Sequence, residues 1–406
     1  MSGCSIAAYF PWRRVKVTYH SVVQASQCAL IKLEPDERFR PLCHACGQPA
    51  RTVHSRTRKF VRDLPFGGYE MLLQVEHRKV GCDCCGGVRV EKLEFVEVHE
   101  RITNRLAAYA AELCRRGLSV QAVAEHLNLD PKTVKECDQA VLEEKFGQTD
   151  YHGLKRLAID EIAVHKGHHY MTVVLDYDSG RVVWMGEGRQ IDTLDAFFAA
   201  MPAEVREGLQ AVAIDMWEPY IQAVRKWCPE ADIVFDLFHV VKTFNKVIDE
   251  IRNEEFRRAD RDGQRALAGG KYLLLKNWKH LRRPQRVRLK EILALNRRLN
   301  TVYLLKDFLK HLWIYHRPGD VKRELAVWCR IAQQDGHPAL ARFAEMLERH
   351  RYGIINHARH ALHTGRLEGV NNKIKVIKRV AYGFHDLRYF ALKVKQAFPG
   401  RRESDN

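Results

Sequence analysis

The sequence contains one short pattern twice, an apolar strand-like segment that ends in aspartate: LAID at 157–160 and VAID at 212–215. Successive side chains of a strand alternate between the two faces of a sheet. The matching phase therefore places Asp160 and Asp215 at equivalent ends of two strands, where their carboxylates can converge. Because an ionised carboxylate is costly to bury without a partner, the pair predicts a functional site. Simple caps or turns at two strand ends are the alternative.

The order of elements from 150 to 240 narrows the fold further. Three strands (LKRLAIDEIAV, HYMTVVLDY and RVVWMGEG) precede a helix at TLDAFFAAM, a fourth strand at LQAVAID, a helix at EPYIQAVRKWC and a short strand at ADIVFD. This is the layout of the ribonuclease-H-like fold, in which acids on the first and fourth strands bind Mg²⁺ for two-metal attack on a phosphodiester. The pattern of 241–362 indicates an all-helical, basic insertion, and that of 363–400 indicates two closing helices.

A site of this kind needs a third acid on a later helix, and Glu368 in RLEGVNNKIKVIKRV fits that place. The other acids near Asp160 have simpler interpretations. Glu161 points to the opposite face of the strand and is expected to be solvated or structural. Asp176 and Asp178 precede a Ser-Gly pair and are expected in a hairpin turn.

The chain of 406 residues carries a net charge of +17, which favours a polyanionic partner such as nucleic acid. The excess is concentrated in two windows: 252–298 has fifteen Lys or Arg against five acids, and 366–402 has ten against two. Each window alone could be a solvated face. The second follows Glu368 directly, so a DNA backbone beside the acids would pass Lys373, Lys375, Lys378 and Arg379.

Four of the eleven cysteines form two Cys-x-x-Cys pairs, Cys43 with Cys46 and Cys82 with Cys85. Four thiolates in tetrahedral geometry select Zn²⁺, so residues 41–98 are predicted to be a small module held by structural zinc. Cys84 could replace Cys82. Further alternatives are four ordinary thiols, or His54 or His77 as one ligand. The basic residues Arg56, Arg58 and Lys59 lie between the pairs and suggest that the module touches DNA.

Residues 119–141 have the length of a helix-turn-helix, whose second helix lies in the major groove of DNA. Asn128 can take the left-handed conformation that ends a helix. Asp130 can cap the next helix, with Pro131 in its first turn. Near the start of that second helix lie Lys132, Thr133 and Lys135, the predicted DNA contacts. A helical hairpin that only packs a core is the alternative.

Three longer strings carry a resemblance to a known family: AIDMWEPYIQAV at 213–224, DLFHVVK at 236–242 and RLEGVNNKIKVIKRVAYGFHDLRYF at 366–390. They resemble the bacterial insertion-sequence DDE transposases of the ISL-three group, and the similarity extends over nearly the whole chain. The resemblance implies a catalytic triad of Asp160, Asp215 and Glu368 that binds two Mg²⁺ ions, which Mn²⁺ can replace. It also marks His239, with Asp236 beside it, as an auxiliary part of the site.

By the same resemblance, the protein is expected to bind the terminal inverted repeats of its element and to cut and join DNA strands as a homodimer or higher oligomer. No long apolar run or signal peptide is present, so a bacterial cytoplasmic, nucleoid-associated protein without a membrane partner is expected. The predicted domains are N-terminal strands (1–40), the zinc module (41–98), the helix-turn-helix region (101–148), the catalytic domain (150–240 and 363–400) and its insertion (241–362).

Two other kinds of protein would share parts of this sequence pattern. A ribonuclease-H-like DNA nuclease would have the same metal site without transposition. A zinc-containing DNA-binding regulator would use the α/β domain only as a scaffold, although intact acids at all three positions count against it. Trp278 and Trp313 in the insertion could stack on an extruded base, with core packing as the favoured interpretation.

Overall fold

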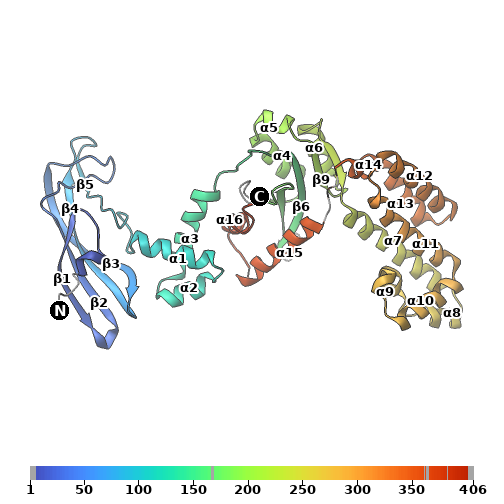
Figure 1. Cartoon of the computed structure of the whole chain (residues 1–406), viewed down its shortest axis with the longest axis horizontal. Coiled ribbons are helices and arrows are strands. Elements are labelled where there is room, and N and C mark those ends of the chain that lie inside the picture. The colour runs from blue at the N-terminus through green and yellow to red at the C-terminus, as the bar shows by residue number, and fades with distance from the viewer. Residues whose placement is uncertain (1–5, 166–168, 361, 363–364, 382, 401–406) are drawn as a thin grey trace. The chain divides into compact units, whose positions relative to one another are not determined.

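The computed structural model describes residues 6–165, 169–360, 362, 365–381 and 383–400. Arg401 and Arg402, at the end of the second basic window, lie outside these ranges. The chain divides into two compact units, Met1–Gln148 and Thr149–Asn406, which are described separately below (Figure 1). No helix in the described ranges combines the length and the apolar character needed to cross a bilayer.

The first unit begins with a five-stranded sheet. Its strands are β1 (Val15–Val23), β2 (Cys28–Pro35), β3 (Thr52–Phe66), β4 (Tyr69–Gly81) and β5 (Val88–Val90), with short 3-10 turns η1 (Ile6–Tyr9) and η2 (Gln24–Ser26). The order is β1-β2-β4-β3, and β5 also pairs with β4. Strands β2 and β4 are parallel, and the other pairs are antiparallel. Alternate residues of β2 and β4, such as Ile31, Leu33 and Leu73, form the core of the sheet.

Three helices complete the first unit: α1 (Asn104–Arg115), α2 (Val120–Leu127) and α3 (Pro131–Phe146). The predicted turn between α2 and α3 is confirmed. Asn128 has a left-handed backbone (φ 47°), and the Asp130 side chain accepts a hydrogen bond from the backbone N–H of Lys132. Arg62 of β3 donates to the backbone carbonyls of Leu127 and Asn128, so a strand residue satisfies the end of α2.

The second unit contains another five-stranded sheet, formed by β6 (Arg156–His165), β7 (His169–Asp176), β8 (Val182–Glu187), β9 (Ala211–Ile214) and β10 (Asp232–Phe235). The order is β10-β9-β6-β7-β8. Strands β6, β7 and β8 are antiparallel neighbours, whereas β9 is parallel to both β6 and β10. The strands and helices follow the order expected from the sequence. Asp160 lies inside β6, in agreement with the predicted strand LKRLAIDEIAV and not at a strand end as the short pattern LAID suggested, because pairing with β7 continues to His165.

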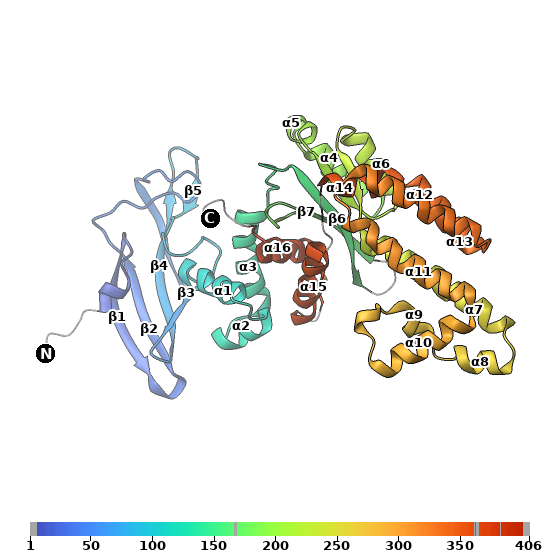
Figure 2. The ribbon, with the colours of Figure 1, turned by 45° about the vertical axis from the view of Figure 1, so that its right-hand side comes forward.

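Helices cover both faces of this sheet (Figure 2). Helices α4 (Ile191–Ala200), α6 (Glu218–Trp227) and α7 (Leu237–Arg258) share a core with one face, and α5 (Ala203–Glu207) follows α4. Helices α15 (Gly365–Val380) and α16 (Leu387–Ala397) pack on the other face. Because strand side chains alternate, Leu157 and Ile159 enter the first core, and Ala158 and Ile162 enter the second.

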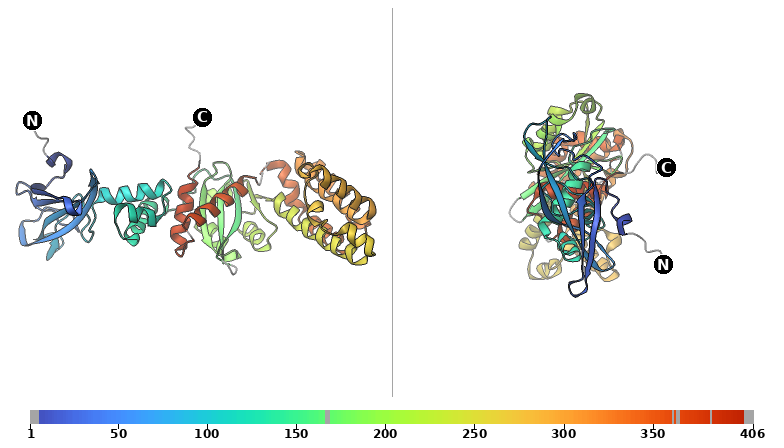
Figure 3. Two further views of the ribbon diagram at one scale, coloured as in Figure 1. Left: turned by 90° about the horizontal axis from the view of Figure 1, so that it is seen from below. Right: turned by 90° about the vertical axis from the view of Figure 1, so that its left-hand side faces the viewer.

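The chain between β10 and α15 is helical. After α7 it forms α8 (Arg261–Leu267), α9 (Lys271–Leu275), η3 (Trp278–His280), α10 (Arg283–Leu295), α11 (Arg297–His311), η4 (Leu312–Ile314), α12 (Pro318–Gln334), α13 (Pro338–Arg349) and α14 (Arg351–His360) (Figure 3). Trp328 is fully buried against Phe244 and Phe343 at its centre. Trp313 is also buried, whereas 37% of the Trp278 surface is exposed.

Helix α14 packs on the sheet through a glycine. A Cβ on Gly353 would lie 2.4 Å from Cδ2 of Phe235, the last residue of β10. Asn356, one turn later, donates its side-chain amide to the Ile233 carbonyl at 3.1 Å. The absence of a side chain at Gly353 thus permits close contact between the last helix of the helical region and the edge of the sheet.

We expect Gly353→Ala to lower the free energy of unfolding by about 1 to 3 kcal/mol, because the new methyl group overpacks the contact with Phe235. Gly369→Ala in α15 is the matched control, since a Cβ there meets nothing within 4 Å. That variant should be more stable by about 0.5 to 1 kcal/mol from helix propensity alone. Denaturant unfolding followed by tryptophan fluorescence tests both, since six of the seven tryptophans lie after residue 148. Equal shifts for the two variants would contradict the packing argument.

Candidate functional site

The parallel pairing of β6 and β9 brings Asp160 and Asp215 together. Its register aligns Leu157 with Val212 and Ala158 with Ala213. Asp160 lies two residues beyond Ala158 within β6, and Asp215 lies two residues beyond Ala213, directly after the end of β9. Both aspartates line one small cavity. The equivalence predicted from LAID and VAID is therefore present in the folded chain, although the register comes from strand pairing that the sequence pattern does not show.

Asp236 and His239 line the same cavity, at the start of α7. The Asp236 side chain caps the helix by accepting a 2.6 Å hydrogen bond from the backbone N–H of Phe238. His239 Nε2 lies 3.8 Å from Asp160 Oδ1 and 3.9 Å from Asp236 Oδ2. Burial lowers the pKa of His239 and favours its neutral imidazole. The two auxiliary residues proposed from the sequence thus lie beside Asp160.

Asp215 has the most strongly perturbed carboxyl group of the site. Burial raises its pKa from 3.8 to about 7, and the nearby charges of Glu161, Asp160 and Asp236 add to the effect. A 3.0 Å hydrogen bond from the Trp217 backbone N–H opposes the shift. Burial also raises the pKa of Asp160. Carboxylates crowded in this way repel one another, and a bound cation would relieve the repulsion.

Glu161 takes part in this crowding, which the sequence reasoning missed. Its neighbours in β6 alternate as expected, but its side chain is 21% exposed and its carboxylate lies 4.0 Å from Arg189. Burial raises the pKa of Glu161, and the charge of Asp160 raises it further. Glu161 is therefore a half-buried acid whose charge reaches the site, rather than a solvated one.

Asn371 is the second residue that the sequence reasoning missed. From α15 it donates its side-chain amide to Asp160 Oδ2 at 2.6 Å, while the Glu161 backbone N–H donates to Asp160 Oδ1 at 2.9 Å. The side-chain carbonyl oxygen of Asn371 is buried and has no hydrogen-bond partner among the described residues. The signal in the sequence that could have identified Asn371 was a polar residue between two apolar positions, Val370 and Ile374, which are both buried in the helix.

Glu368 lies in the first turn of α15 and is exposed. It precedes Asn371 by three residues, so both residues lie along one side of the helix. Within the described residues, no hydrogen bond joins Glu368 to either aspartate. The helix itself is held at the site by Asn371, which places Glu368 one turn from that contact.

The basic residues that follow Glu368 have different environments. Lys373 donates to the Ala397 carbonyl at 2.7 Å and lies over the Phe398 ring, and Lys378 donates to the Ala163 carbonyl at 3.1 Å. Lys375 and Arg379 are exposed. The charge of Lys375 lowers the pKa of Asp160, so this lysine contributes to the field at the site.

The cysteine pairs form a cluster in the first unit. The sulfur atoms of Cys43, Cys46, Cys82 and Cys85 all lie within 4.8 Å of one another, and Cys46 and Cys82 are 3.6 Å apart. Four metal–sulfur bonds of about 2.3 Å in a tetrahedron require sulfur separations of roughly 3.8 Å. Cys84 is exposed and is not part of the cluster, and neither are His54 and His77. The folded chain thus selects Cys82 over Cys84.

The other predicted DNA contacts of the first unit are mostly engaged within the chain. Arg56 pairs with Glu37 and Glu76, Arg58 also faces Glu76, and Lys59 donates to three backbone carbonyls of residues 97–100. In α3, Lys132 is exposed, and Thr133 and Lys135 are half-buried. The helix-turn-helix therefore offers a more accessible cation than the strands do.

The chain matches two family models. One, described as "Transposase", spans residues 157–394, and the other, described as "Helix-turn-helix domain of transposase family ISL3", spans residues 91–137. The first covers the sheet of the second unit, the helical region and α15. The chain belongs to the ISL3 transposase family. Members of this family with its DDE domain are enzymes that transfer DNA strands, and the helix-turn-helix domain implies DNA binding.

Relatives agree with this assignment. The chain is 43% identical over 373 residues to the transposase for insertion sequence element IS1001 of Bordetella parapertussis, a match that covers 91% of each chain. It is 29% identical over 383 residues to the transposase for insertion sequence element IS1557 of Mycobacterium tuberculosis, with 87% of this chain and 85% of the relative covered. Both matches extend through the two units.

For this ISL3 family member we expect Cys82→Ser to lose a tightly bound metal ion, because the cluster then retains only three thiolates. Cys84→Ser is the matched control, and it should retain one metal ion per chain. Metal content after extensive dialysis, measured by mass spectrometry, distinguishes the variants. Retention by Cys82→Ser together with loss by Cys84→Ser would reverse the assignment.

The raised pKa of Asp215 predicts a pH dependence of stability when no Mg²⁺ is added. The folded carboxyl holds its proton to about pH 7, whereas the unfolded one loses it near 3.8. Its contribution to stability is therefore complete below pH 4 and is lost as the pH rises through 7. Asp215→Asn should be more stable than the wild type at pH 8 by about 1 to 3 kcal/mol, given about 1.4 kcal/mol per pKa unit. Below pH 5 the difference should shrink. A constant difference across this range, measured by denaturant unfolding, would contradict the prediction.

Proposed function

We propose that this chain binds the terminal inverted repeats of its insertion sequence and catalyses Mg²⁺-dependent cleavage and strand transfer at Asp160, Asp215 and Glu368. The observation that carries the proposal is the in-phase placement of Asp160 and Asp215 on adjacent parallel strands, with α15 anchored to Asp160 through Asn371. The sheet order β10-β9-β6-β7-β8 supports a ribonuclease-H-like catalytic domain. The helices between α7 and α14 would then be its insertion.

The residues at the site fit a hard divalent cation. Mg²⁺ prefers carboxylate and other oxygen ligands, and the site offers Asp160 and Asp215 together with the unpartnered side-chain oxygen of Asn371. Glu368 would add the third carboxylate from the same side of α15. Bound Mg²⁺, or Mn²⁺ in its place, would supply Lewis-acid activation of the attacking and leaving oxygens, with two ions at the full site.

The chain's own residues would orient the acids. The N–H groups of Glu161 and Asn371 hold one oxygen each of Asp160, and the Trp217 N–H holds Asp215. His239 and Asp236 lie beside Asp160 and would limit how its carboxylate can turn. Water would first attack a scissile phosphate placed between the two aspartates. The 3′-hydroxyl released by cleavage would then attack target DNA in the same place.

The remaining parts would serve DNA recognition. We propose that the four cysteines bind Zn²⁺, which holds the sheet module together, and that α3 enters the major groove with Lys132, Thr133 and Lys135 at its start. The insertion proposed for 241–362 would end earlier, since α14 packs on β10. Two element ends must be processed together, so a homodimer or higher oligomer is proposed. It would act at the nucleoid in the bacterial cytoplasm.

We expect Asp160→Asn to reduce Mg²⁺-dependent cleavage of labelled element ends by at least about 100-fold, because metal-assisted stabilisation of the reacting oxygens is worth several kcal/mol. Glu368→Gln should have a similar effect, and both variants should still bind the ends. Asp178→Asn is a matched control, since Asp178 pairs with Arg156 outside the cavity. Full activity of Asp160→Asn would overturn the triad. Wild-type binding without cleavage would indicate a regulator, and cleavage without strand joining would indicate a nuclease.

A further inference from the structure

One stretch of the helical region carries positive charge without any acidic residue. Residues 276–290 include seven Lys or Arg and no Asp or Glu. They extend from the end of α9 through η3 into α10, beside α7 (Figure 2). We call this stretch the α9–α10 patch; its cationic members are Lys276, Lys279, Arg282, Arg283, Arg286, Arg288 and Lys290.

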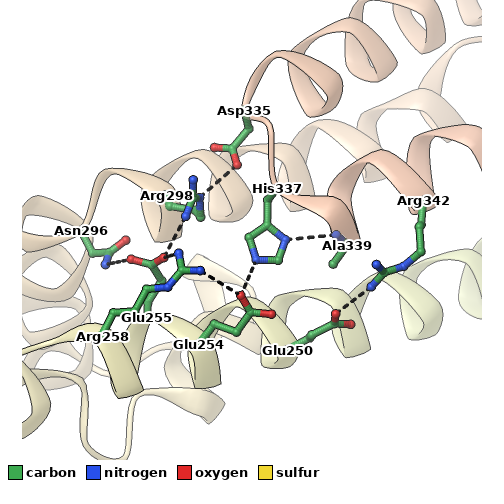
Figure 4. Close-up of polar contacts among 10 residues, drawn as sticks. All are labelled: Glu250, Glu254, Glu255, Arg258, Asn296, Arg298, Asp335, His337, Ala339 and Arg342. Atoms are coloured by element: carbon green, nitrogen blue, oxygen red, sulfur yellow. Dashed lines mark hydrogen bonds and ion pairs between the residues drawn. The ribbon is translucent and has the colours of Figure 1, made fainter.

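The patch differs from neighbouring parts of the helical region, in which many cations form ion pairs with acids. Several cations elsewhere in that region face acids: Arg298 reaches Glu255 at 3.0 Å, and Arg342 reaches Glu250 at 2.8 Å (Figure 4). Directly beside the patch, Lys271 pairs with Asp249 at 2.7 Å. Across the described ranges of the chain, no such partner lies within 4.0 Å of the patch cations. The exposed patch therefore concentrates much of the excess charge of the helical region.

Stability of the fold does not explain this placement. The partial positive charge at the start of a helix disfavours cations there, yet Arg282 is the N-cap of α10, Arg283 is its first residue and no acid lies in the first turn. Two members have a structural role, since Arg288 donates to the Ala268 carbonyl at 2.7 Å and Arg286 to the Lys279 carbonyl at 3.4 Å. The exposed members would repel one another unless an anion binds.

Trp278 holds part of the patch in place. Arg286 Cζ lies 5.6 Å and Lys290 Nζ 5.7 Å from the centre of its ring, which is within the range of cation–π attraction. These two cations occupy the surroundings of the ring, which argues against base stacking on Trp278. Gln285, the amide side chain in the first turn of α10, accepts from the Arg282 backbone N–H at 3.0 Å. The patch therefore offers ordered charge rather than groups free to read bases.

Helix α7 connects the patch to the acidic site. It begins beside Asp236, and Lys271 of α9 pairs with Asp249, thirteen residues beyond Asp236. At about 1.5 Å per residue, that contact lies roughly 20 Å along the helix. Duplex DNA rises about 3.4 Å per base pair, so this distance corresponds to about six base pairs.

We propose that the α9–α10 patch binds the phosphate backbone of duplex DNA without sequence preference, about six or more base pairs from the phosphate that is cut. The inference rests on the proposed function, because it assumes that duplex DNA is bound at the site of Asp160 and Asp215. Sequence recognition would remain with the helix-turn-helix. The patch would add affinity and hold the duplex in line with the catalytic acids.

The test compares two quadruple variants of the full chain. The patch variant combines Lys279→Gln, Arg282→Gln, Arg283→Gln and Lys290→Gln, all at exposed positions. The control combines Arg258→Gln, Arg265→Gln, Arg323→Gln and Arg342→Gln, which removes the same charge from four exposed arginines that face acids. Thermal unfolding should show both variants folded. Binding is measured without added divalent metal and without chelator.

Each phosphate contact contributes about −0.9 to the slope of log K against log[salt]. The patch variant should reduce the magnitude of that slope by about 3 to 4 relative to the control, and equally on element-end and unrelated duplexes. Hydroxyl-radical footprints on element ends should lose protection six or more base pairs from the cleavage point. Equal slopes for the two variants, or a loss confined to the element-end sequence, would overturn the proposal. Failure of wild-type cleavage with an intact patch effect would count against the proposed function instead.

Discussion

The second unit is organised around two carboxylates that its strands force together. Parallel pairing of β6 with β9 places Asp160 and Asp215 at matching positions, where burial raises the pKa of both and the charges of neighbouring acids raise that of Asp215 further. An arrangement of this kind is unfavourable without a cation. The surrounding structure compensates in part, since N–H groups from β6, from the start of α6 and from α15 each donate to one of the two acids.

Two helices extend this constraint to the rest of the unit. Helix α7 starts at the site with Asp236 and His239 and continues into the helical region, so one continuous element joins the site to that region. Helix α15 returns the chain from that region to the opposite face of the sheet and contacts Asp160 through Asn371. The long helical segment between them can therefore differ in its surface without disturbing the placement of the acids.

The charge of +17 is distributed unevenly once the chain is folded. In the β3–β4 sheet, Arg56 and Arg58 are matched by acids and Lys59 is partly buried against carbonyls. The number of basic residues in this part of the sequence therefore overstates the positive charge that the sheet can offer to a partner. The seven cations of the α9–α10 patch form no ion pair within the described part of the chain, and all of them except the half-buried Arg286 are exposed. Folding thus separates structural arginines from those that can meet DNA, a distinction that local composition does not reveal.

Much of the local structure followed from short-range chemistry. The left-handed Asn128, the Asp130 cap and the strand–helix order before β10 depend on neighbouring residues, so periodicity and capping rules were sufficient. The two Cys-x-x-Cys pairs could also be recognised from the sequence, because the spacing within each pair is a local property. Where the sequence failed, the missing quantity was a partner from a distant segment. Asn371, for example, donates to Asp160 from a helix 211 residues further along the chain, a contact that no local pattern indicates.

The sequence by itself determined the family, the elements and the residue types that can bind a metal or DNA, because these depend on patterns within short segments. Only the tertiary structure decided which residues act together. It selected Cys82 over Cys84, brought Glu161 and Asn371 to the two aspartates, and left Glu368 exposed one turn away. The physical reason is that distance and burial, which set electrostatic energy and metal geometry, arise from strand register and helix packing between segments far apart in the chain.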